Sequence, residues 1–149
     1  MRQTMRLAPL FTVALVVSAS AYAQDQNPAS RKIDHPIVGT WQWTRAANQC
    51  TEVYRFGSDG SGSVSSGAER TDDTYEVAST PEGRGRYKLA ITTIRDHGGQ
   101  DCVGSEVDST GKTATGYVGF SPALDAMILC ADATSDRCIG PMRRVGPLR

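Results

Sequence analysis

From residue 37 onward, apolar and polar positions alternate along short stretches, which is the period of a half-buried β-strand. Tyr87, Leu89 and Ile91 share one face of the clearest stretch, and Trp41 and Trp43 share a face of the first. Apart from the first 23 residues, no stretch has the i, i+3, i+4, i+7 spacing of an amphipathic helix. The alternation predicts strands over residues 37–44, 51–56, 63–66, 74–78, 86–94, 103–107, 113–120, 126–131 and 138–145.

Turn-forming residues separate these stretches at intervals of about 8–12 residues, which is typical of an antiparallel sandwich or barrel. Ser58–Gly62 and Asp96–Asp101 are the clearest turns, and we assign Asp72 and Asp73 to a further loop that spans residues 66–73. Pro141 interrupts the last stretch and predicts an edge or a bulge there. We therefore predict an all-β fold, an antiparallel up-and-down β-barrel of about eight strands.

The first 23 residues have a different pattern. Arg2 and Arg6 precede an apolar run over residues 7–17, and Ala21-Tyr22-Ala23 follows it. A charged start, a short apolar run and an Ala-x-Ala exit predict a secretory signal peptide. The run is shorter than the roughly 20 residues that cross a bilayer, so no membrane span is expected. We expect a signal peptide over residues 1–23, a flexible leader over 24–36, a single barrel domain over 37–145 and a tail over 146–149.

Charge excludes one class of function. Without the signal peptide, 14 of the 16 Lys and Arg side chains remain beside 16 Asp and Glu, a formal charge of −2. A nucleic-acid binder that depends on phosphate attraction needs a basic surface, so this class is not expected. The remaining length suits one ordinary core. We expect an exported monomer, periplasmic or secreted.

The cysteines support export and predict how the barrel is braced. An even number in a short exported chain indicates two disulfides, with three possible connectivities. If every turn reverses the chain, Cys50 and Cys102 fall at one end of the barrel, and Cys130 and Cys138 flank the last hairpin at the opposite end. Bridged Cα atoms lie within about 7 Å of each other, so this topology favours Cys50–Cys102 and Cys130–Cys138. The two loops would contribute about 4 and about 2.6 kcal/mol.

One motif resembles a known family. Gly39-Thr40-Trp41 at the start of the first strand resembles the Gly-x-Trp motif of lipocalins and their calycin relatives, and Met142-Arg143-Arg144-Val145 supplies arginines from the last strand. In that family the tryptophan closes one end of an eight-stranded barrel beneath such an arginine. The resemblance implies that Arg143 or Arg144 covers Trp41, a contact worth roughly 0.5–2 kcal/mol. This chain is shorter than a typical lipocalin and lacks a helix pattern before its last strands.

Several side chains are candidates for a ligand cavity, although small barrels also fill their interiors with such residues. Tyrosine and tryptophan combine an apolar ring with a polar group, which suits either a pocket or a barrel mouth. A carboxylate on an inward face needs a partner or an opening to water. The candidate lining residues are Trp43, Tyr54, Tyr75, Tyr87 and Glu52.

The sequence contains no recognisable catalytic or metal-binding constellation. His35 and His97 are the only histidines, and neither has a second ligand at a familiar spacing. No serine lies in a Gly-x-Ser-x-Gly elbow. We therefore expect no enzyme, no cofactor and no metal.

Two hypotheses follow. The first is a lipocalin-like binding protein that holds a small apolar or amphipathic molecule at the barrel mouth. The second is a protein-binding module, such as an exported hydrolase inhibitor, that contacts its partner through residues 27–36 or the 66–73 loop. A cavity of some 300 Å³ would favour the first hypothesis, and a filled barrel the second.

Overall fold

The computed structural model describes residues 32–146; the predicted signal peptide and most of the predicted tail lie outside this range. Eight strands follow one another along the chain, with one short 3₁₀ turn, η2 (Gly83–Gly85), between the fourth and the fifth. The strands are β1 (Gly39–Thr44), β2 (Thr51–Phe56), β3 (Ser61–Ser66), β4 (Glu69–Val77), β5 (Tyr87–Asp96), β6 (Thr113–Phe120), β7 (Ala126–Cys130) and β8 (Cys138–Val145).

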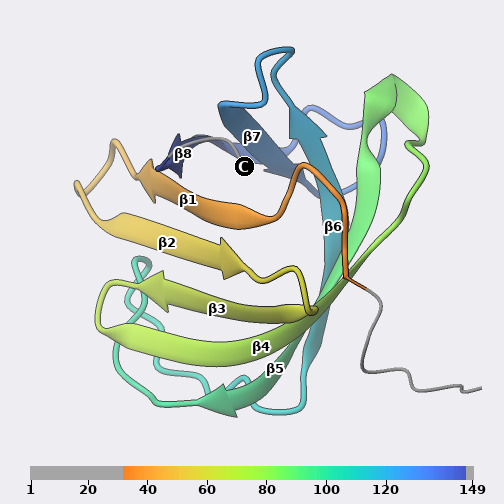
Figure 1. Cartoon of the computed structure of the whole chain (residues 1–149). Coiled ribbons are helices and arrows are strands. Elements are labelled where there is room, and N and C mark those ends of the chain that lie inside the picture. Colours follow the sequence, from red (N-terminus) through yellow and green to blue (C-terminus); the bar gives the residue numbers. More distant parts are fainter. Residues whose placement is uncertain (1–31, 147–149) are drawn as a thin grey trace, which may run out of the picture.

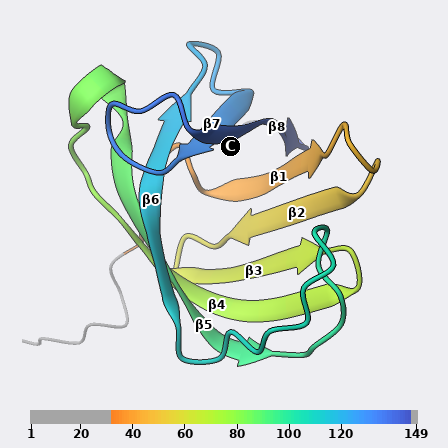
Figure 2. The same ribbon diagram turned by 180° about the vertical axis from the view of Figure 1, so that it is seen from behind.

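Each strand pairs antiparallel with its neighbours in sequence, and β8 pairs with β1, so the sheet closes into an up-and-down barrel. Figures 1 and 2 show the sheet wrapping around from β1 to β8. Closure leaves no sheet edge for Pro141, and the ladder between β7 and β8 instead shifts register between Met127 and Leu129. The predicted fold class is confirmed, and the disturbance at Pro141 is a bulge.

The alternation of burial along the strands identifies the inner face. In β1, Trp41 is fully buried while Gln42 is exposed, and in β4 every second residue from Thr71 to Tyr75 is buried. The inward side chains with the largest apolar surface form one core. We call this cluster the apolar half of the barrel; it consists of Ile37, Trp41, Phe56, Tyr75, Leu89, Val118, Met127 and Met142.

Two details of the strand prediction were wrong. The expected 66–73 loop does not exist, because β3 ends at Ser66 and β4 begins at Glu69 after a two-residue turn. Gly67 makes this turn possible with a φ of 60°, a conformation that costs glycine little. Residues 103–107 form no strand and belong instead to the long connection from β5 to β6.

Both predicted disulfides are present, Cys50–Cys102 and Cys130–Cys138. The chain reverses direction after each strand, and it has eight strands rather than the nine that the sequence predicts. Counting these reversals would put both disulfides at the same end of the barrel. However, β7 is short, and its turn into β8 lies against the connection from β4 to β5, where Arg86 donates hydrogen bonds to the carbonyls of Asp132 and Ser135. Figures 1 and 2 both show this turn on the opposite side from the loop between β1 and β2. The disulfides indicate an oxidising, extracytoplasmic compartment.

Candidate binding site

The inward positions beyond the apolar half carry polar and aromatic side chains. The register aligns them across three strands, because Glu52 of β2 pairs with Trp43 of β1 and with Ser66 of β3. Glu52 and Ser66 are buried, whereas Trp43 and Tyr54 stay partly exposed although they pack against the core. We call this group the polar half of the barrel; it consists of Trp43, Glu52, Tyr54, Ser66, Glu69, Thr71 and Asp73.

Glu52 is the centre of a small polar network in this half. Its carboxylate accepts a hydrogen bond from the Tyr54 hydroxyl at 2.7 Å, and the Arg45 guanidinium lies 3.6 Å away. Arg45 also lies over the ring of Trp43, 5.3 Å from its centroid. Burial, followed by the bond to Glu52, raises the pKa of Tyr54 and keeps this phenol protonated. The sequence-predicted residues Trp43, Tyr54 and Glu52 thus meet in one network.

Sequence reasoning missed the other four members of the polar half, which are Ser66, Glu69, Thr71 and Asp73. Asp73 is 5% exposed and accepts a hydrogen bond of 2.8 Å from the Thr71 hydroxyl, which is also buried. The sequence prediction places Asp73 in the loop between two expected strands and interprets the Asp72-Asp73 pair as loop charge. The signal was present, since the alternation that turns Tyr75 inward also turns Asp73 and Thr71 inward.

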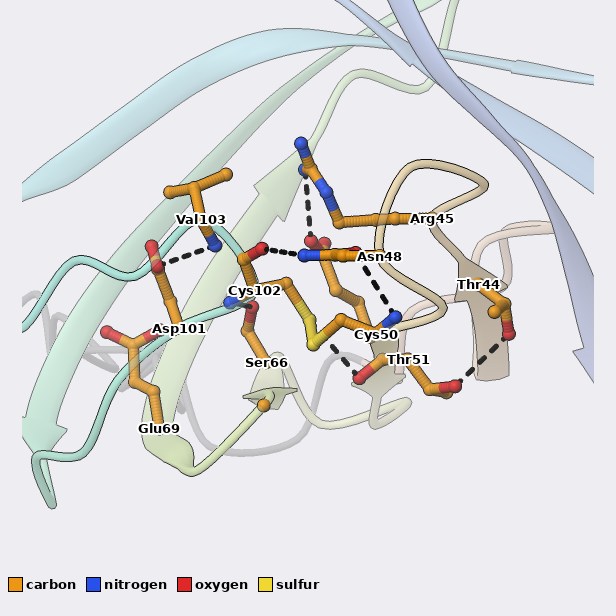
Figure 3. Close-up of a disulfide and its surroundings, with 12 residues drawn as sticks. Thr44, Arg45, Asn48, Cys50, Thr51, Ser66, Glu69, Asp101, Cys102 and Val103 are labelled. Carbon is orange, nitrogen blue, oxygen red and sulfur yellow. Dashed lines mark hydrogen bonds and ion pairs between the residues drawn. A yellow bond between two sulfur atoms is a disulfide. The ribbon is translucent and has the colours of Figure 1, made fainter.

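Carboxylates dominate the charge of the polar half. Burial raises the pKa of Glu69, and the nearby carboxylates of Asp96, Asp101, Asp73 and Glu52 raise it further. Figure 3 shows the Glu69 side chain beside Asp101. In such a field a ligand with a positively charged or hydrogen-bond-donating group would be favoured over an anion.

The disulfide Cys50–Cys102 ties together the turns around the polar half (Figure 3). The Asn48 side chain, in the turn from β1 to β2, donates to the Cys102 carbonyl at 2.7 Å. The Cys102 N–H in turn donates to the Ser66 hydroxyl at the end of β3, at 3.0 Å. The disulfide and these hydrogen bonds therefore join the turn from β1 to β2, the connection from β5 to β6 and the end of β3. Together they restrain the shape of this end of the barrel.

The other two candidate lining residues lie with the apolar half. Tyr75 is 4% exposed, packs edge-to-face on Phe56 with 4.9 Å between centroids, and donates to the Gly57 carbonyl. Burial raises its pKa to about 12. Tyr87 contacts the ring of His35 edge-on at 4.6 Å. The five candidates are thus divided between the two halves, three in the polar half and two beside the packed core.

The Gly-x-Trp stretch closes the apolar half. The Trp41 ring is fully buried, its Nε1–H donates to the Ile37 carbonyl, and the guanidinium of Arg144 lies 4.1 Å from its centroid. Arg144 also donates to the carbonyls of Pro36 and Val38, while Arg143 is exposed beside Asp125. A side chain at position 39 would collide with Arg144, because a Cβ there would lie 2.5 Å from Nη1.

The end of the predicted leader takes part in this closure. Ile33 donates its N–H to the Ser58 carbonyl, and the Ile37 N–H donates to Nδ1 of His35. The Nε2 atom of His35 is buried and has no hydrogen-bond partner among the described residues, and burial lowers the pKa of this histidine. His97 lies on the surface, 2.9 Å from Asp72. Within residues 32–146, no three His, Cys, Asp or Glu side chains are grouped to hold a metal ion.

Comparison of the chain with protein-family models, with curated proteins and with solved structures finds no match. Within the described part of the chain, no helix has the length and apolar character to cross a bilayer. The fold and the geometry of the site are therefore the basis for a functional proposal.

Proposed function

We propose that this protein is an exported, non-enzymatic, lipocalin-like carrier that holds a small amphipathic molecule in the polar half of its barrel. One observation carries the proposal: the inward rings of Trp43 and Tyr54 remain partly exposed beside the buried carboxylate of Glu52. The exposed part of these rings is surface that a ligand can cover. Aromatic surface together with a few fixed polar groups is the usual composition of a small-molecule site.

The network gives each residue a role. The rings of Trp43 and Tyr54 offer apolar contact surface, worth roughly 25 cal/mol per Å² buried. Glu52, held by Arg45 and Tyr54, presents a fixed acceptor for a polar group of the ligand. The apolar half supports this site rather than contributing to it, because its largest side chains are fully buried.

The two tryptophans make the proposal testable by fluorescence. Trp41 is fully buried and Trp43 is not, so a ligand in the polar half should change the emission of Trp43. We expect the neutral amphipathic dye N-phenyl-1-naphthylamine to bind and to receive energy from Trp43. The variant Trp43→Ala should bind the dye more weakly, whereas Gln42→Ala, exposed on the outer face of β1, should bind it like the parent chain. Equal binding by both variants would locate the dye elsewhere.

A protein-binding role is the second candidate, and one surface feature favours it. Val103 and Val107 in the connection from β5 to β6 are 65% and 66% exposed. Where such side chains form a contiguous patch, they are typical of protein contact surfaces. Under this alternative, the chain inhibits a secreted hydrolase, and the double substitution Val103→Lys/Val107→Lys abolishes inhibition without unfolding the barrel. Our proposal predicts no inhibition, and instead a small-molecule adduct in the native mass spectrum of protein from its own compartment.

A further inference from the structure

The outer face of the barrel carries a hollow that the proposed carrier function does not use. It lies over β6 and β7, with a volume of about 320 Å³. Gly119 and Ile128 face outward here, since their neighbours Val118 and Leu129 face the core. Two arginines belong to an otherwise mostly apolar wall, whose residues are Arg84, Gly85, Arg86, Gly119, Phe120, Ser121, Ala126, Met127, Ile128 and Pro141.

Arg86 is the unusual residue of this hollow. It is 6% exposed, and within residues 32–146 no carboxylate lies within ion-pair distance of it. Its Nη1 donates to the carbonyls of Asp132 and Ser135 at 3.2 and 2.6 Å, while Nε and Nη2 have no hydrogen-bond partner in the described part of the chain. A guanidinium presents five donors in a fork that fits a carboxylate. These unpartnered nitrogens are not sealed from solvent, so an anion can reach them and would stabilise a charge that has no counter-ion.

Arg84 is the second arginine of the same wall, and its position there comes at a cost to the backbone. Its φ is 56° and its ψ is 25°, the left-handed region that disfavours a residue with a side chain by roughly 1–2 kcal/mol. Its only ion pair in the described chain is with Asp136, whose side chain is 89% exposed. Such a pair contributes little to stability. Strained residues of this kind occur often at ligand sites.

We propose that this hollow binds a small organic carboxylate, with the charged group between Arg84 and Arg86 and the apolar group against Ile128 and Pro141. The site is independent of the carrier function: it lies on the outer face of the sheet, and its charge preference is opposite to that of the carboxylate-rich polar half. A ligand in the barrel and an anion in the hollow therefore bind to different residues.

Octanoate is a suitable probe, and 1-octanol is the matched neutral control. In a ¹⁵N-labelled sample of the full barrel, octanoate should shift the Arg86 Nε–H and Gly119 amide signals in a saturable way. The same concentration of 1-octanol should leave the Arg86 signal unchanged. Equal shifts with both compounds would overturn the proposal, because apolar contact alone would explain them. Shifts confined to Trp43 and Tyr54 would also overturn it, since octanoate would then occupy the barrel.

A pair of variants tests the role of charge. Arg84→Gln removes one guanidinium from the hollow, and we expect it to weaken octanoate binding by about fivefold or more. Arg95→Gln makes the same change in net charge on the exposed face of β5, near the other end of that strand, and should leave binding unchanged. Arg84 is exposed and is absent from the core, so this variant should fold even if Arg86→Met does not. Equal affinities of the two glutamine variants would contradict the proposal.

Discussion

The two halves of the barrel interior share strands β1, β2 and β4 but differ in how they are filled. In the apolar half, Trp41, Met127 and Met142 are at most 1% exposed and leave no room for a ligand. In the polar half, Glu52 and Asp73 are buried on the same inward faces, beside rings that remain partly exposed. One half supplies the hydrophobic stabilisation, and the other retains polar groups that stability alone would not select.

The difference teaches how a small barrel can be stable and still carry a site. Burying carboxylates is costly, so the surrounding structure must hold them in place. Here the bridge Cys50–Cys102 restrains the turns at the polar half, and Arg144 with residues 33–38 seals the apolar half.

The two tryptophans should differ most. Trp41→Ala removes a fully buried ring with its hydrogen bond and its cover by Arg144, and we expect a loss of about 3–5 kcal/mol in the free energy of unfolding. Trp43→Ala removes a partly exposed ring and should cost less than about 2 kcal/mol. Urea denaturation followed by circular dichroism measures both. Equal losses would mean that the polar half is packed as tightly as the apolar half.

The two disulfides should contribute unequally to the free energy of unfolding of the protein. Cys50→Ala/Cys102→Ala opens a loop with a sequence separation of 52 and should cost about 4 kcal/mol, whereas Cys130→Ala/Cys138→Ala opens one of 8 and should cost about 2.6 kcal/mol. Thermal unfolding of the two double variants gives the comparison. If Cys50→Ala/Cys102→Ala proves the less destabilising substitution, the turns at the polar half are held by their hydrogen bonds instead of by this disulfide.

Each half contains one tyrosine hydroxyl that donates a hydrogen bond, so removing each hydroxyl compares the stability contributed by a single bond in the two halves. Tyr54→Phe removes a bond to the carboxylate of Glu52, and we expect a loss of about 1.5–3 kcal/mol, the range for a charged partner. Tyr75→Phe removes a bond to the neutral Gly57 carbonyl and should cost about 1 kcal/mol. Urea denaturation followed by circular dichroism measures both losses in the free energy of unfolding. A larger loss for Tyr75→Phe would show that Glu52 finds another partner or water.

The pH response should differ in sign between the halves. Burial lowers the pKa of His35 below 6.5, so the unfolded chain binds the proton more tightly than the folded one. The stability associated with neutral His35 is present above pH 6.5 and is lost as the pH falls below it. We expect His35→Gln to flatten the stability curve between pH 7.5 and 5. An unchanged slope would show that protonated His35 finds solvent or a partner.

Glu69 in the polar half should show the opposite trend. Its folded pKa is raised above 4.5, so the ionised carboxylate destabilises the fold at neutral pH, and this penalty disappears as the pH falls through the folded pKa toward 4.5. Glu69→Gln should therefore stabilise the protein at pH 7 and have little effect near pH 4. Denaturant midpoints at these two pH values test this, and a gain that persists at pH 4 would assign the effect to packing.

The sequence led to the correct disulfide pairing, although one of the nine strands on which that reasoning rested does not form. By itself it determined the fold class and most strand positions. These features rest on local signals, since alternation with a period of two and regularly spaced turns need no knowledge of distant residues. The same alternation, extended back from Tyr75, could have placed Asp73 inside the barrel. The charge of the Asp72-Asp73 pair led us to a loop instead.

Tertiary structure alone decided three other points. It selected Arg144 rather than Arg143 to cover Trp41, because only one of two successive residues in a strand faces inward. It placed the turn from β7 to β8 against Arg86, and it divided the candidate lining residues between the apolar and the polar half. Each outcome depends on strand register around a closed sheet, a long-range property that no local pattern contains.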